Sequence, residues 1–260
     1  MEKRVSLKNN LGKRIVGILN VPKGKPPFSA VVICHGLKGY KEQRHLKTLA
    51  CELEKNKILA LRFDFTNEVG QSAGNIENLS FSQELKDLKS VIDYLTRQKI
   101  VDHKRIGLAG HSLGGQIILT YAPSDGRVKA LADLAGVTFR DGTTNTEKTI
   151  REQMPLAKET GYFFVYSGSK RKKFKIKLSY LDDLLKYNTP ARIKKIKIPT
   201  LIIHGSNDKS VPLRHSRVAY RLLKGIKKLV ILKNMPHTWR NPKDYKRVNP
   251  VVVDWFKKYL

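Results

Sequence analysis

The sequence contains only two cysteines, Cys34 and Cys51, and has no Cys-x-x-Cys pair. Two cysteines make no disulfide framework, and without a Cys/His cluster of zinc spacing we expect no metal and no cofactor. No apolar run approaches the roughly 18 residues of a membrane span. The segment Met1–Val5 lacks the apolar core of a signal peptide, so a cytoplasmic location is expected.

Acidic residues are also scarce. The chain has 51 Lys and Arg against 22 Asp and Glu, a net charge of +29. Such a charge favours non-specific contact with polyanions such as nucleic acid or acidic membranes. The basic residues are spread along the chain, however, and only Lys170-Arg171-Lys172-Lys173 forms a tight run. We therefore assign most of the charge to solvated faces and expect no specific nucleic-acid partner.

Apolar runs alternate with helical patterns along most of the chain. Two paired strands are expected within residues 4–22, and further strands at 30–34, 58–65, 106–109, 129–135, 200–204 and 228–232. Helical spacing of apolar residues predicts helices at 42–56, 80–98, 213–223 and 243–260. Strands alternating with helices predict an α/β fold with a mostly parallel sheet and helices on both faces.

The alternation stops between residues 138 and 198, a polar, basic stretch with scattered aromatic residues. We call this stretch the insertion and predict that it forms a small cap subdomain. The core domain is then built from residues 1–137 and 199–260.

The motif Gly110-His111-Ser112-Leu113-Gly114 follows an apolar run and precedes an apolar helical pattern. In that setting Gly-x-Ser-x-Gly is typical of a nucleophile elbow, a tight turn from strand to helix that exposes the serine hydroxyl. The glycines leave room where a Cβ atom would collide, and the Leu113 amide would face a developing oxyanion. The motif alone also fits a glycine-rich turn before an ordinary helix.

A serine nucleophile needs a base, and the base needs a carboxylate that holds its tautomer. Asp208 and His237 each follow one of the expected late strands. The order Ser112, Asp208, His237 is that of the α/β-hydrolase triad. The loop after the strand at 30–34 usually gives the second oxyanion donor, for which the Leu37 amide is the candidate.

The other histidines and the aromatic residues of the insertion receive secondary assignments. His35 and His111 are expected to support the site and are further candidates for the substrate pocket, and His204 is expected to end a strand. Three histidines without a motif are expected at the surface: His45, His103 and His215. Five aromatic residues are candidates for the wall of an acyl or aryl pocket, although each could equally pack between insertion and core: Tyr162, Phe163, Phe164, Tyr166 and Phe174.

Over nearly its whole length the chain resembles the α/β-hydrolase superfamily. The resemblance rests on His35-Gly36, Arg62-Phe63-Asp64-Phe65, the serine motif, His204-Gly205-Ser206-Asn207-Asp208 and Pro236-His237. It is most similar to cinnamoyl (feruloyl) esterases and related carboxylesterases. Residues 161–184 resemble in outline the cap of those enzymes, which is a hairpin followed by a helix. It departs from them in the loop Thr66–Gly70, which is not a compact Gly-x-Gly, and in the lysine run of the insertion.

Together these features predict a serine carboxylic-ester hydrolase that acts on small acyl or aryl esters, hydroxycinnamoyl esters among them. Ser112 is expected to attack, His237 to accept the proton, Asp208 to orient His237, and the Leu37 and Leu113 amides to bind the oxyanion. A thioesterase, a lysophospholipase or a small peptidase would use the same groups. A basic polyanion-binding protein on a hydrolase scaffold is the alternative from another class. The sequence leaves monomer and homodimer open.

Overall fold

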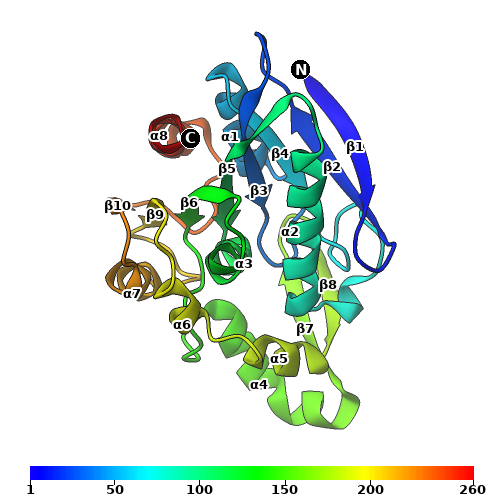
Figure 1. The fold of residues 1–260 in the computed structure, drawn as a ribbon. Coiled ribbons are helices and arrows are strands. Elements are labelled where there is room, and N and C mark those ends of the chain that lie inside the picture. Colours follow the sequence, from blue (N-terminus) through cyan, green and yellow to red (C-terminus); the bar gives the residue numbers. More distant parts are fainter.

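A central sheet of eight strands runs through the computed structural model, which describes residues 1–260 (Figure 1). Its spatial order is β1-β2-β4-β3-β5-β6-β9-β10. The pairs β1–β2 and β2–β4 are antiparallel, and all other neighbours are parallel. The strands are β1 (Glu2–Lys8), β2 (Arg14–Asn20), β3 (Phe28–Cys34), β4 (Leu59–Phe63), β5 (Val101–His111), β6 (Val128–Leu134), β9 (Thr200–Gly205) and β10 (Lys227–Leu232).

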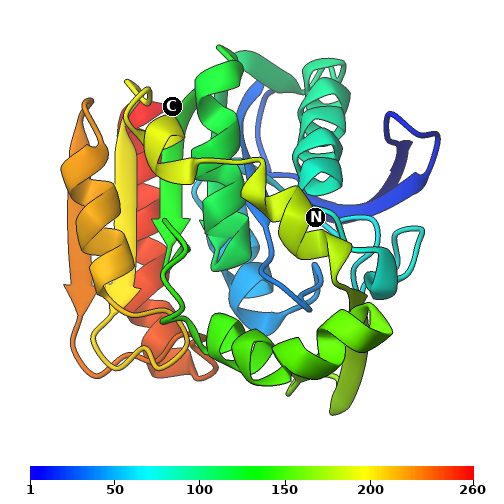
Figure 2. The same ribbon diagram turned by 90° about the horizontal axis from the view of Figure 1, so that it is seen from below.

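Helices cover both faces of this sheet (Figure 2). The helices α1 (Arg44–Lys55) and α8 (Pro242–Tyr259) pack on one face, and α2 (Phe81–Thr96), α3 (Leu113–Tyr121) and α7 (Arg214–Leu222) on the other. Within β3, Val32 belongs to the core on the α2–α3 side, whereas Val31 and Ile33 belong to the core on the α1–α8 side. A strand buried on both faces explains the continuous apolar run, and the predicted α/β fold is confirmed.

Between β6 and β9 the chain leaves the sheet, and this segment lies at the bottom of Figure 1. It forms α4 (Asn145–Thr160), the hairpin of β7 (Tyr162–Ser167) and β8 (Lys172–Lys177), α5 (Ser179–Leu185) and α6 (Thr189–Ile193). The expected outline of a hairpin followed by a helix omits α4. A capping box of Thr144 and Glu147 starts this helix, and Gly161, at φ 77°, ends it.

The insertion is tied to the core by apolar and polar contacts. Ile150, Phe163 and Ile176 belong to the same apolar cluster as the α2–α3 side of the sheet. The carboxylate of Asp183 on α5 accepts hydrogen bonds from Ser80 Oγ at 2.8 Å and from the Ser82 amide at 2.9 Å, at the start of α2. Two short 3₁₀ helices, η1 (Ile76–Asn78) and η2 (Ala122–Ser124), complete the fold. None of the helices is long and apolar enough to cross a membrane.

Candidate active site

Ser112 lies on the turn between β5 and α3, with φ 56° and ψ −117°. A positive φ is strained for a residue with a Cβ atom, and such strain is concentrated at functional sites. Neighbouring backbone approaches so closely that only glycine fits beside the serine. A Cβ atom on Gly110 would lie 2.2 Å from the Gly114 carbonyl oxygen, and one on Gly114 would lie 2.5 Å from that of Cys34. The motif therefore forms the tight strand-to-helix turn that a nucleophile elbow requires.

Asp208 follows β9 and His237 follows β10, and their side chains meet. His237 Nδ1 donates a hydrogen bond of 2.7 Å to Asp208 Oδ2. The other carboxylate oxygen accepts from the amides of Ser210 and Val211, both at 2.8 Å. Ser112 and His237 line the same pocket, although no hydrogen bond joins Ser112 Oγ to the imidazole. The aspartate is thus fixed against one ring nitrogen of a histidine that shares the serine's pocket.

A second histidine lies against the same carboxylate. His204 Nε2 is 3.2 Å from Asp208 Oδ2 and donates to the Val211 carbonyl oxygen at 2.9 Å. Burial favours the protonated form of Asp208, but the hydrogen bonds from His204 and His237 outweigh it and hold the pKa of Asp208 far below its ordinary value. Asp208 stays ionised at neutral pH and can stabilise a charged imidazole. The sequence placed His204 only at a strand end.

His111 contacts the loop that carries His237. Its Nε2 donates to the His237 carbonyl oxygen at 2.9 Å, and the two ring centroids are 4.7 Å apart. Burial, together with His45 and His237 nearby, lowers the pKa of His111, so its ring stays neutral. His45 and His215 are buried rather than at the surface, because helix packing covers them, whereas His103 is exposed as expected.

The loop between β3 and α1 passes beside Ser112. A Cβ atom on Gly36 would lie 3.0 Å from Ser112 Cβ and 3.1 Å from the His111 carbonyl oxygen. The next residue, Leu37, lines the pocket together with Leu113. The two residues whose amides are the oxyanion candidates therefore line the same pocket as Ser112.

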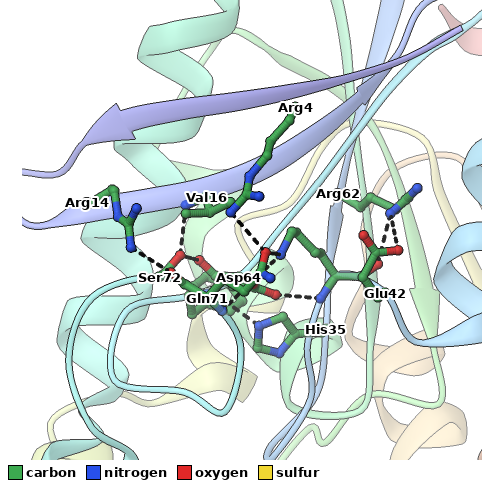
Figure 3. Close-up of polar contacts among 11 residues, drawn as sticks. Arg4, Arg14, Val16, His35, Glu42, Arg62, Asp64, Gln71 and Ser72 are labelled. Atoms are coloured by element: carbon green, nitrogen blue, oxygen red, sulfur yellow. Dashed lines mark hydrogen bonds and ion pairs between the residues drawn. The ribbon is translucent and has the colours of Figure 1, made fainter.

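Residues after β4 anchor this loop (Figure 3). The backbone amide and the ammonium of Lys41 both lie 2.6 Å from the carboxylate of Asp64, and Lys41 Nζ also lies 2.9 Å from Gln71 Oε1. The Phe65 amide donates to His35 Nε2 at 3.1 Å. Asp64 and Lys41 are buried, so few water molecules compete with this pair. The anchor fixes the loop that carries Leu37.

A cavity of about 660 Å³ opens beside Ser112. The β3–α1 loop, α4, the tip of the β7–β8 hairpin, α5 and the His237 loop contribute to its wall. Its apolar surface comes in part from Ile150, Tyr180, Leu181 and Leu184. A pocket of this size holds a small organic molecule. No group of three or more His, Cys, Asp or Glu side chains in the structure is arranged to hold a metal ion.

Of the expected pocket residues, His111 and Tyr166 line the cavity. Five others lie outside it and are corrected here: His35, Tyr162, Phe163, Phe164 and Phe174. Phe163 is completely buried and packs between hairpin and core, whereas Phe164 is 40% exposed, because successive residues of a strand face opposite sides. The ring of His35 instead accepts a hydrogen bond from the Phe65 amide.

Comparison with known proteins identifies the family of the chain. The sequence profile of the prolyl oligopeptidase family matches residues 73–260. The chain belongs to this family. It is therefore an α/β-hydrolase of the serine-hydrolase type, as the resemblance to that superfamily predicted.

Relatives of this family member include an uncharacterized 31.7 kDa protein from the traX-finO intergenic region of Escherichia coli, 25% identical over 97% of this chain and 98% of that protein. Esterase EstD of Thermotoga maritima is 24% identical over 83% of this chain and 55% of EstD. Among solved structures, Est1E of Butyrivibrio proteoclasticus with bound ferulic acid superimposes with a TM-score of 0.80 at 22% identity, over 98% of both chains. The α/β-hydrolase GrgF of a Penicillium species gives a TM-score of 0.84 at 19% identity, over 100% of this chain and 99% of GrgF. At identities this low, the superpositions show a shared fold.

Proposed function

We propose that this hydrolase is a serine carboxylic-ester hydrolase that acts on small acyl or aryl esters. The observation that carries the proposal is the hydrogen bond of 2.7 Å between His237 and Asp208 in a pocket shared with Ser112. The strained backbone of Ser112 adds support, because it presents the hydroxyl to the same cavity.

In the proposed mechanism, Ser112 Oγ attacks the ester carbonyl carbon while His237 Nε2 accepts the hydroxyl proton. The Leu37 and Leu113 amides donate to the oxyanion of the tetrahedral intermediate, and Asp208 stabilises the imidazolium. When the intermediate collapses, His237 protonates the departing alcohol and an acyl-serine remains. A water molecule then attacks the acyl carbonyl by the same proton transfers, releasing the acid and free Ser112.

Two observations guide the choice of substrates. Est1E, of similar fold, is known with ferulic acid bound, so hydroxycinnamoyl esters are the first aryl esters to test. The family is named for oligopeptidases, which makes a small proline-containing peptide the second class. The scissile group depends on pocket shape rather than on the triad, so thioesters and lysophospholipids belong in the same panel.

The test is turnover of 4-nitrophenyl acetate, 4-nitrophenyl butyrate, methyl ferulate and a prolyl 4-nitroanilide by the wild type and Ser112→Ala. We expect ester cleavage that falls in Ser112→Ala to the residual level of triad mutants, about 10³- to 10⁴-fold over water. A fluorophosphonate should add its mass to the peptide that contains Ser112. Unchanged activity in Ser112→Ala would exclude this nucleophile. Salt-dependent DNA binding without turnover would favour the polyanion-binding alternative.

A further inference from the structure

Lys38 directly follows the oxyanion candidate Leu37 and is held in a strained conformation, with φ 59°. Its backbone amide donates a hydrogen bond of 3.1 Å to Glu68 Oε1. Glu68 is buried in the loop after β4, and its other oxygen accepts from the Val69 amide at 3.3 Å. Strain of this kind persists only where surrounding contacts enforce it. The contact with Glu68 fixes the backbone of Lys38, a residue that lines the pocket.

The ammonium group of Lys38 has no partner within the protein. It is half-buried, yet it makes no hydrogen bond, ion pair or cation–π contact. Lys41, three residues further on, is fully buried and bound by both Asp64 and Gln71. A partly buried charge without a partner costs free energy, and burial accordingly lowers the pKa of Lys38. An anion in the pocket would remove this cost.

Glu68 is the carboxyl group whose charge acts on Lys38, but it binds the Lys38 backbone amide and forms no ion pair with the ammonium. Burial raises the pKa of Glu68 to about 8, against the hydrogen bonds from the Lys38 and Val69 amides, so Glu68 is mostly uncharged at neutral pH. Another carboxylate on the pocket wall, that of Glu147, accepts from the Thr144 amide at 3.1 Å and from Thr144 Oγ1 at 2.8 Å. This carboxylate is therefore engaged in capping the start of α4.

Three further cations stand on the pocket wall and are exposed: Arg44, Arg140 and Arg240. Arg140 is 3.9 Å from Glu147, and neither Arg44 nor Arg240 forms an ion pair. The pocket wall therefore carries an excess of positive charge, with Lys38 its most buried cation. Such a pocket raises the local concentration of anions.

We propose that Lys38 binds a carboxylate of the substrate, and that the natural substrate is an ester with a carboxylate a few bonds from the scissile carbonyl. The inference rests on the proposed esterase function. Because Lys38 adjoins the Leu37 amide, an anion at its ammonium lies close to the acyl group that the amide binds. One ammonium matches the single charge of a carboxylate, whereas the three arginines, exposed to water, favour approach rather than tight contact.

The test compares monomethyl glutarate, which carries a free carboxylate, with its neutral diester, dimethyl glutarate. Methanol release gives kcat/KM for each, with the diester value halved for its two equal ester groups. We expect the wild type to favour the monoester, and Lys38→Gln to lower the monoester-to-diester ratio by about tenfold, more than an exposed charge gives. Lys38→Arg should keep the preference, because it retains the positive charge.

Lys99→Gln is the matched control, since this exposed lysine lies just before β5, at the opposite end of that strand from Ser112. It should leave the ratio unchanged. An unchanged ratio in Lys38→Gln, with both esters still cleaved, would overturn the inference and leave the esterase proposal standing. Cleavage of neither ester, nor of any ester in the earlier panel, would instead overturn the esterase proposal. Competitive inhibition by inorganic phosphate stronger than that by glutarate would overturn the choice of a carboxylate.

Discussion

The Nε2 atom of the buried His204 lies 3.2 Å from Oδ2 of Asp208. The same oxygen accepts the hydrogen bond from His237. His204 is itself fixed by the Val211 carbonyl oxygen at 2.9 Å and by Ser216 Oγ at 2.7 Å. The orientation of the Asp208 carboxylate thus depends in part on a histidine that does not line the pocket.

We therefore expect substitutions of Asp208 and His204 to lower kcat to different extents. Asp208→Asn should lower kcat by about 10⁴-fold, because an amide no longer selects the productive His237 tautomer. His204→Gln should lower kcat by up to about 100-fold, because it displaces the Asp208 carboxylate without removing its charge. Steady-state kinetics with 4-nitrophenyl butyrate distinguishes the two. Equal losses in both variants, with intact circular dichroism spectra, would contradict a purely positioning role for His204.

Gly36 offers a steric test of the oxyanion loop. In Gly36→Ala the new methyl group would lie 3.0 Å from Ser112 Cβ and 3.1 Å from the His111 carbonyl oxygen, so loop and elbow must separate. Since oxyanion donors act over a narrow range of distance, we expect kcat to fall by about 10²- to 10³-fold with a smaller change in KM. Gly126→Ala is the control, because a Cβ atom there meets nothing within 4 Å. Full activity in Gly36→Ala would show that the loop does not hold the oxyanion.

The sheet and its helices were predictable because their apolar patterns are local. Residues 30–34 form a continuous apolar run because β3 is covered on both faces. In contrast, α4 is only weakly amphipathic and contains Pro155, so periodicity does not reveal it. The sequence does contain a signal for the start of α4, since Thr144 and Glu147 have the spacing of a capping box. The aromatic residues of β7 could not be assigned to the pocket or the core without knowing which way the strand faces.

At the site, the elbow and the order of Ser112, Asp208 and His237 follow from short motifs. The groups behind them do not, because they come together only through tertiary structure. His204 reaches Asp208 because the loop after β9 folds back on the strand end. Glu68 reaches the Lys38 amide across 30 residues of sequence, and Thr66–Gly70 had signalled only a departure from the related esterases.

Glu68 provides a prediction for stability against pH. Burial raises its pKa in the folded protein to about 8, whereas an unfolded glutamate titrates near 4.3. The folded state therefore binds an extra proton between these values. Its stabilising effect is complete below about pH 4 and is lost as pH rises through about 8. Glu68→Gln should remove a slope of about 1.4 kcal/mol per pH unit from this window.

Urea unfolding at several pH values between about 5 and 8 measures that slope. Glu152→Gln is a suitable control, because this side chain is exposed on the surface of α4. Buried Glu84 also has a raised pKa, caused first by burial and then by Glu68, so the variant should keep the part of the slope due to Glu84. Identical pH profiles for wild type and Glu68→Gln would show that Glu68 is ionised in the folded protein.

The tightest basic run lies at the tip of the β7–β8 hairpin, beside the pocket wall. Lys170 Nζ lies 4.1 Å from the centre of the Tyr40 ring, and Tyr40 lines the cavity together with Ser167, Gly168 and Ser169 of the hairpin tip. The run is exposed, so its field should act on approaching anions and be screened by salt. Lys38 is half-buried, and a contact with its ammonium should be screened less.

Salt therefore separates the two contributions. Replacing Lys170, Arg171, Lys172 and Lys173 by glutamine should lower kcat/KM for monomethyl glutarate by about threefold at low ionic strength. The difference should vanish well above 0.1 M salt, where the screening length falls below about 10 Å. The loss in Lys38→Gln should persist under the same conditions. A control that removes the same charge from exposed positions elsewhere uses Lys3, Lys8, Lys13 and Lys99. If this control and the hairpin variant lose the same activity, net charge alone attracts the substrate and the hairpin has no special part in it.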